Sequence, residues 1–220
     1  MDSLLNLHYA TADGHHKRIT GRNTGSQCYS MIGRDRMRNI QKCVETILKD
    51  EVEGDFIECG VWRGGACIFM KAVIRAFPAG FRRVWLADSF QGCPESTLHQ
   101  DAELDLRGQW AATKSEVLEN FNRYSLMDDI HFLEGWFKDT LPTAPISKLA
   151  LLRIDADLFE STTDALTHLY PKLQPGGYCI IDDYGAYKEC KKAVDLYRDA
   201  NNVQEPIKMI DFTGAYWRKT

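Results

Sequence analysis

The sequence predicts an α/β fold, in which a mostly parallel, seven-stranded sheet is covered by helices on both faces. After Gly54, short apolar runs alternate with amphipathic segments, the pattern of parallel strands joined by helical crossovers. The last two apolar runs are separated only by residues 211–214. That spacing is too short for a parallel crossover, so we expect an antiparallel hairpin that leaves one reversed strand at the sheet edge.

The chain of 220 residues is expected to form an arm followed by one domain. Residues 1–33 are polar and weakly periodic, so we expect an arm or lid there, ahead of a single domain over residues 34–220. The first helix is predicted over residues 36–49, where apolar side chains recur at helical spacing, and Asp35 is placed to cap it. No repeat, low-complexity tract or Pro/Gly-rich linker divides the remainder.

Strands and helices alternate through the rest of the chain. Short apolar runs predict strands over residues 56–59, 84–87, 130–133, 149–154, 178–181, 207–210 and 215–218. Apolar residues at helical spacing predict further helices over residues 65–77, 115–124, 161–173 and 187–201. The Pro-Gly-Gly sequence at residues 175–177 marks the end of the helix over 161–173.

Composition and charge argue against several classes of function. The formal net charge of −4 provides no broad cationic surface for nucleic acid or anionic lipid. No apolar stretch approaches the roughly 20 residues of a membrane-spanning helix, and the N-terminus lacks a signal-peptide pattern, so we expect a cytoplasmic protein. The 7 cysteines contain no CxxC pair, and we expect them to be reduced and mostly buried.

Acidic residues stand at the C-terminal ends of the predicted strands. They are Glu58, Asp88, Glu134, Asp155, Asp182 and Asp183. In an open parallel sheet these strand ends line the crevice where ligands bind. Turn and cap chemistry explains an acid at any one position, but it explains the whole series less well. Carboxylates in one crevice repel each other, so they imply a cationic or hydroxyl-rich ligand.

A glycine turn follows the first strand in the segment IECGVWRGG. Gly60 and Gly64 allow the backbone to approach a ligand closely, while Glu58 offers a carboxylate to an amino group or a bound water. The spacing is not GxGxxG, and Glu58 would oppose a pyrophosphate. Asp88 suits the two hydroxyls of a ribose, with Ser89 bordering the base. Together these features indicate a nucleoside, although a tight turn without a ligand also explains the glycines alone.

The acids after the fourth and fifth strands indicate a metal site. Asp155, Asp182 and Asp183 are hard oxygen ligands with no His or Cys between them, which suits Mg²⁺ and not zinc. A metal there can hold the oxygens of an acceptor and lower the pKa of a hydroxyl, with Asp157 as the general base. For Asp157, capping of the next helix is an equally good interpretation. For the Asp182–Asp183 pair, the alternative is an exposed loop and a helix cap.

Motifs shared with one known family run through most of the chain. They are SMIGRDRMRNI, GDFIECGVWRGGACIFM, ADSFQG, FLEGWFKDTLP, LALLRIDADLFEST, LYPKLQPGGYCIIDDYG and YWRK, and they cover about residues 29–219. On these motifs the sequence closely resembles the macrocin O-methyltransferase family of antibiotic biosynthesis, which acts on sugars of macrolides and related natural products. The resemblance implies a Rossmann-like class I methyltransferase fold, S-adenosylmethionine and Mg²⁺ as cofactors, and a homodimer.

The resemblance also implies roles for individual residues. Asp155, Asp182 and Asp183 would hold the metal, and Asp157 would be the base. Contacts to the cofactor or acceptor are implied at Glu58, Gly60, Asp88, Ser89, Met31, Ile32 and Trp136, and we add Gly64 and Asp155 to the predicted cofactor site. The expected reaction moves the methyl of S-adenosylmethionine to a hydroxyl of a small molecule, a sugar of a glycosylated natural product.

Three alternatives are weighed against methyl transfer. DxD with a later DD also occurs in haloacid-dehalogenase phosphatases, but those enzymes place DxD on the first strand of the core and not on the fourth. The glycine spacing disfavours an NAD-dependent oxidoreductase. A catalytically silent cofactor-binding subunit could retain Glu58 and Asp88, but the intact acids from Asp155 onward argue against it.

Overall fold

The computed structural model describes residues 28–77, 82–95 and 98–220. Its centre is a seven-stranded sheet with the strand order β3-β2-β1-β4-β5-β7-β6. The strands are β1 (Asp55–Cys59), β2 (Val84–Asp88), β3 (Ile130–Glu134), β4 (Leu149–Ile154), β5 (Leu173–Ile181), β6 (Lys208–Met209) and β7 (Ala215–Arg218). The first five are parallel to one another, and β7 is antiparallel to both β5 and β6. The predicted fold class is therefore confirmed.

The reversed strand lies one place inside the edge of the sheet. β7 pairs with β5 over four residues on one side and with β6 over two residues on the other. The outermost strand is thus β6, which is only two residues long. The hairpin expected from the short 211–214 connection is present, and it inserts its second strand between β5 and β6.

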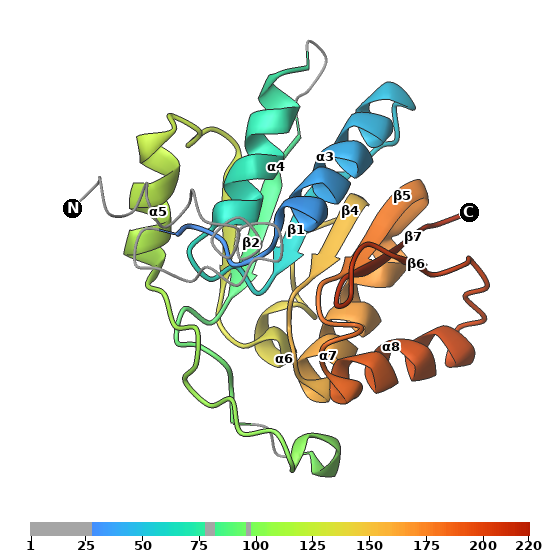
Figure 1. Ribbon diagram of the computed structural model, residues 1–220. Coiled ribbons are helices and arrows are strands. Elements are labelled where there is room, and N and C mark those ends of the chain that lie inside the picture. Colours follow the sequence, from blue (N-terminus) through green and yellow to red (C-terminus); the bar gives the residue numbers. More distant parts are fainter. Residues whose placement is uncertain (1–27, 78–81, 96–97) are drawn as a thin grey trace, which may run out of the picture.

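Helices cover both faces of the sheet (Figure 1). One face carries α3 (Arg34–Lys49), α4 (Gly65–Arg75) and α5 (Lys114–Arg123), and the other carries α6 (Phe137–Thr140), α7 (Phe159–Leu169) and α8 (Lys188–Ala200). Successive strand residues supply the two cores in turn, since Phe56 packs with the first group of helices and Ile57 with the second. Two short 3₁₀ helices, η1 (His99–Asp101) and η2 (Tyr170–Lys172), complete the described elements.

Two local expectations were wrong. The first helix begins at Arg34 with Gly33 as its N-cap, so Asp35 lies inside the first turn instead of capping it. Pro-Gly-Gly at 175–177 does not follow a helix but lies within β5, where the register to β4 shifts between Leu149 and Leu151. The bulge requires glycine, because a Cβ on Gly177 would lie 2.7 Å from the backbone oxygen of Ala150.

The strand order places the topological switch point of the sheet between β1 and β4. From β1 the chain proceeds to β2 and β3 on one side, and it then returns to β4 on the other side. Such a switch point separates the loops that follow the two strands, and it is where open α/β sheets bind ligands. Within the described ranges, no helix combines the length and apolar character needed to cross a membrane.

Candidate active site

A cavity of about 570 Å³ opens at this switch point. Its lining includes nearly every site residue that the sequence predicts, namely Met31, Ile32, Glu58, Gly60, Asp88, Ser89, Trp136, Asp155, Asp157, Asp182 and Asp183. Gly64 is not part of the lining, since it is the N-cap of α4 and faces Val117 and Phe121. Glu134 also lies outside, where it is exposed and paired with Lys114. The carboxyl ends of β1, β2, β4 and β5 thus meet in one place.

Gly60 brings the ends of β1 and β4 into close contact. Its φ is +87°, and a Cβ at this position would lie 1.7 Å from the backbone oxygen of Asp155. The backbone N–H of Asp155 in turn donates to the oxygen of Cys59 at 2.8 Å. Only glycine combines this backbone conformation with this approach, so Gly60 fixes the floor of the cavity.

Asp88 organises the glycine turn through backbone hydrogen bonds. Its carboxylate accepts from the N–H groups of Val61 at 2.6 Å, Trp62 at 3.2 Å and Phe90 at 2.7 Å. Burial raises the pKa of Asp88, and these three donors oppose that rise. Ser89 donates to the backbone oxygen of Gly92 at 3.0 Å. Asp88 thus holds the glycine turn and the start of the loop after β2 together.

A buried arginine joins three of the acids. Arg153 on β4 is fully buried, and its guanidinium donates to Glu58, to Asp155 at 2.9 Å and to Asp182. The second oxygen of Glu58 accepts from the thiol of Cys67 at 2.7 Å. Burial raises the pKa of Glu58 to about 7, against the attraction of Arg153. Glu58 is thus held from two sides beneath the cavity.

Asp182 is held by two arginines. Besides Arg153, it accepts from Arg36 at the start of α3, and Arg36 also pairs with Asp211 at 3.1 Å. Burial raises the pKa of Asp182 to about 6, and Arg153 and Arg36 oppose the rise. The two arginines therefore tie the end of β5 to α3 and to the β6–β7 turn.

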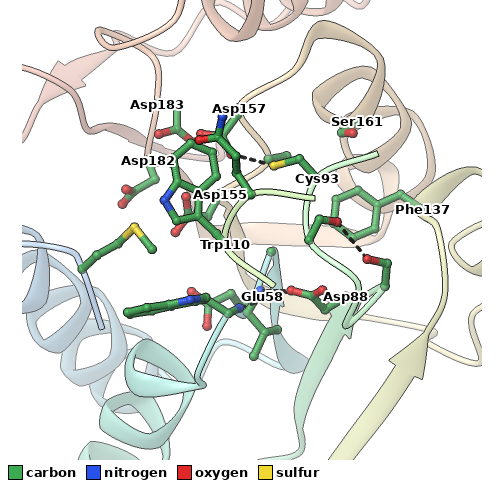
Figure 2. A pocket seen from close by; sticks show the side chains of 18 of the residues that line it. Glu58, Asp88, Cys93, Trp110, Phe137, Asp155, Asp157, Ser161, Asp182 and Asp183 are labelled. Carbon is green, nitrogen blue, oxygen red and sulfur yellow. Dashed lines mark hydrogen bonds between the residues drawn. The ribbon is translucent and has the colours of Figure 1, made fainter. Parts of the chain in front are cut away.

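Three aspartates gather above this layer. Asp155, Asp157 and Asp183 each offer an oxygen, and these oxygens lie within 4.8 Å of one another. Figure 2 shows them at one side of the cavity, with Glu58 and Asp88 below. Asp183 Oδ2 is buried without a hydrogen-bond partner among the described residues. An all-oxygen set with an unpartnered oxygen fits a hard divalent cation.

The electrostatics of this cluster favour a cation. Burial and then the charges of Asp155 and Asp182 raise the pKa of Asp157 to about 8. The pKa of Asp183 is also raised well above its ordinary value, first by burial and then by Asp157. Both shifts express the cost of placing several carboxylates together out of water, a cost that a bound cation removes.

The cluster differs in one member from the metal set predicted from the sequence. Asp155 and Asp183 belong to both sets, whereas Asp157 occupies the third position in the cluster and Asp182 faces the arginines. Asp157 does not cap α7, because the N-cap of that helix is Leu158 and has no side-chain cap of its own. Instead the carboxylate of Asp157 faces the cavity, where the thiol of Cys93 donates to it at 3.8 Å.

Several lining residues were not predicted as site residues. They are Tyr29, Arg36, Trp62, Cys93, Trp110, Phe137 and Tyr187. Trp62 and Trp110 have φ values of 47° and 54°, a region that bulky residues seldom adopt. Strain of this kind is typical of functional sites, but it cannot be read from residue type. These residues give the acidic cavity an aromatic wall.

Comparison with known proteins identifies relatives over almost the whole chain. The model of a family described as Macrocin-O-methyltransferase (TylF) matches residues 4–219. An 8-demethyl-8-(2,3-dimethoxy-alpha-L-rhamnosyl)-tetracenomycin-C 4'-O-methyltransferase from Streptomyces olivaceus is 51% identical over 210 residues, which are 92% of this chain and 80% of the relative. The mycinamicin III 3''-O-methyltransferase of Micromonospora griseorubida is 47% identical over 212 residues, 92% of this chain and 83% of the relative.

Solved structures agree with this relationship. The structure of the O-methyltransferase NovP superposes with a TM-score of 0.90 at 43% identity and covers 100% of this chain and 99% of its own. An O-methyltransferase from Bacillus cereus in complex with SAH has a TM-score of 0.56 at 12% identity, covering 99% of this chain and 97% of its own, and shares the fold. The seven-stranded sheet is therefore that of class I methyltransferases.

Proposed function

The chain belongs to the macrocin O-methyltransferase family and is an S-adenosylmethionine-dependent O-methyltransferase, and we propose that its acceptor is a sugar hydroxyl of a glycosylated natural product. The observation that carries this proposal is the cavity, in which an acidic cluster and an aromatic wall lie beside a glycine turn. Carboxylates accept hydrogen bonds from sugar hydroxyls, and tryptophan rings such as Trp110 offer apolar faces to a sugar ring. The Streptomyces olivaceus relative is named for a substrate with a rhamnosyl group.

The cofactor site that we propose lies at the glycine turn. When bound, S-adenosylmethionine supplies an electrophilic methyl group. Gly60 permits the close approach, and Asp88 holds the turn and faces the nucleoside. Met31, Ile32, Ser89 and Trp136 border the same cavity, and Glu58 anchors its floor. Membership of this family sets aside the phosphatase, oxidoreductase and silent-subunit alternatives.

The acidic cluster is the proposed site of Mg²⁺. When bound, a hard divalent cation lowers the pKa of a coordinated hydroxyl. Asp155 and Asp183 are its ligands in our proposal, with Asp182 as the third ligand and Asp157 as the base that accepts the proton of the acceptor hydroxyl. Burial and the neighbouring carboxylates raise the pKa of Asp157 and so favour its protonated form, whereas a bound cation would oppose that rise and favour the carboxylate that a base requires.

A second assignment is favoured by the geometry of the cluster. Asp157 lies with Asp155 and Asp183, whereas both oxygens of Asp182 already accept from arginines. In this assignment Asp157 is a ligand and Asp182 is an anchor for Arg153. The two assignments differ in whether Asp157→Asn or Asp182→Asn loses Mg²⁺ binding.

Product analysis tests the proposed acceptor. The full chain is incubated with S-adenosylmethionine, Mg²⁺ and a rhamnosylated polyketide, and in parallel with the same polyketide lacking its sugar. We expect mass spectrometry to find a gain of one methylene on the sugar fragment of the glycoside only. Methylation of the sugar-free compound would contradict the proposal. A sample with Asp155→Asn serves as the inactive control, because that variant loses a proposed ligand.

A further inference from the structure

The N-terminus of α7 is capped by a residue far away in the sequence. The first N–H groups of a helix have no partner within the helix, and a nearby side chain usually accepts from them. Here Asp101, at the end of η1, does so: one oxygen accepts from Phe159 N at 2.7 Å and the other from Glu160 N at 3.1 Å. Asp101 is only 3% exposed. Both oxygens of this buried carboxylate therefore bind α7 to η1.

Asp101 occupies the capping position at α7 that Asp157 could otherwise take. Asp157 lies two residues before the start of α7, a position from which an aspartate commonly accepts from backbone N–H groups two or three residues ahead. Those groups belong to Phe159 and Glu160, the two that Asp101 already satisfies. The carboxylate of Asp157 lies instead in the cavity, beside Asp155 and Asp183.

The segment that carries Asp101 also forms part of the cavity wall. Residues 98–113 run from η1 to the start of α5, and Gln109 and Trp110 within this segment line the cavity. The segment is paired with Cys93, whose N–H donates to Gln109 O at 3.0 Å and whose oxygen accepts from Gly108 N at 2.9 Å. The thiol of Cys93 reaches Asp157. One segment thus contacts both the start of α7 and the partner of Asp157.

We propose that Asp101 is a positioning residue for methyl transfer: by capping α7 from the 98–113 segment, it keeps Asp157 in the cavity and Trp110 in the wall. Without Asp101, the N–H groups at the start of α7 have no acceptor, and the carboxylate of Asp157 turns to accept from them, because a buried donor without a hydrogen bond costs free energy. The 98–113 segment then loses its attachment to α7. The part of this inference that concerns catalysis rests on the proposed function.

Thiol labelling tests the attachment without any acceptor or turnover. Cys93 and Cys28 are both partly buried, and among the described residues Cys93 pairs with the 98–113 segment whereas the backbone oxygen of Cys28 accepts from Arg63. The full chain is treated with N-ethylmaleimide, and mass spectrometry of peptides gives the ratio of the two labelling rates. We expect Asp101→Ala to raise the Cys93 rate relative to Cys28 by about tenfold, the factor expected for loss of a helix cap. Asp101→Asn, which keeps one acceptor oxygen, gives an intermediate ratio.

A matched control separates this role from ordinary helix capping. Thr113, the last residue of the 98–113 segment, caps α5 by accepting from Glu116 N at 3.2 Å, and Thr113→Ala removes that cap but leaves both contacts of Asp101 to α7 in place. We expect Thr113→Ala to lower the melting temperature and leave the labelling ratio unchanged. An unchanged ratio in both Asp101 variants would overturn the proposal and leave Asp101 as a cap only.

Kinetics provide the second readout. With a glycoside that the wild type methylates, we expect Asp101→Ala to lower kcat by about tenfold or more while the KM for S-adenosylmethionine stays unchanged, because the glycine turn is not altered. Equal loss of kcat in Thr113→Ala would overturn the link to Asp157. A failure to find any methylated glycoside affects the proposed function alone, since the labelling experiment does not depend on it.

Discussion

Arg153, which is fully buried near the C-terminal end of β4, donates to Asp182, and the same guanidinium contacts Glu58 and Asp155. The ends of β1, β4 and β5 are thereby joined through one cation. Carboxylates at neighbouring strand ends would otherwise repel one another in a site with little water. The relationship explains how this sheet holds several acids at one switch point before any ligand binds.

Removal of this cation should destabilise the fold strongly. We expect Arg153→Met to lower the free energy of unfolding by about 3–5 kcal/mol, because it leaves buried carboxylates without their partner. Urea denaturation followed by circular dichroism measures the change. Arg83→Met is the control, since Arg83 is half-exposed and lies 3.9 Å from Asp55, and it should cost about 0.5 kcal/mol or less. Similar costs for the two variants would contradict the role of Arg153.

Gly60 should tolerate no side chain. Gly60→Ala places a methyl group against the backbone of Asp155, in addition to the strain of its positive φ. Gly108→Ala has the same kind of φ, +70°, but no atom lies within 4 Å of its Cβ. We expect about 1 kcal/mol of destabilisation for Gly108→Ala and at least about 3 kcal/mol for Gly60→Ala. Calorimetric titration with S-adenosylhomocysteine should also detect no binding to Gly60→Ala, and normal binding would refute the assignment of the turn.

Mg²⁺ should stabilise the folded protein through the acidic cluster. A ligand at about 100 times its Kd adds about 2.7 kcal/mol to the free energy of unfolding. We expect the melting temperature to rise with Mg²⁺ and to return to its starting value with EDTA. Asp183→Asn should remove the response, because Asp183 contributes the unpartnered oxygen. Glu134→Gln, an acid at a strand end outside the cavity, should retain it. A response that persists in Asp183→Asn would place the ion elsewhere.

Asn variants at Asp157 and Asp182 should show which of the two residues is a metal ligand and whether Asp157 is the general base. A base can be removed without loss of the Mg²⁺-dependent rise in melting temperature, but turnover then falls by about 10²–10⁴-fold. A ligand variant loses the rise and the turnover together. If Asp157 is the base, Asp157→Asn retains the rise and Asp182→Asn loses it. The opposite pattern would establish the cluster of Asp155, Asp157 and Asp183 as the ligand set.

The sequence predicted the fold well because its signals were periodic. Each long strand was placed within a residue or two, except β5, since buried parallel strands appear as apolar runs between turn residues. The short elements α6 and η1 escaped prediction, because four or three residues are too few to establish a period. Pro-Gly-Gly was interpreted as the end of a helix because Pro and Gly interrupt regular secondary structure. The same property lets these residues form the bulge in β5.

The sequence predicted where the candidate site lies, but it did not predict which side chains contact one another there. Strand topology alone brings Glu58, Asp88, Asp155 and Asp183 to one cavity. Which acid faces an arginine and which faces the cavity depends on contacts between distant segments. Asp101 illustrates the limit, because it lies 58 residues from the helix that it caps. The homodimer implied by the family resemblance stays a prediction, which light scattering in solution would test.

Anomalous diffraction from crystals grown with Mn²⁺ and S-adenosylhomocysteine tests the central claim most directly, because Mn²⁺ accepts the same oxygen ligands as Mg²⁺. We expect one Mn²⁺ within about 2.2 Å of oxygens from both Asp155 and Asp183. The nucleoside should lie in the same cavity against the turn at Gly60. A cavity that holds the nucleoside with no Mn²⁺ at these aspartates, or a Mn²⁺ bound only outside the cavity, would contradict the account.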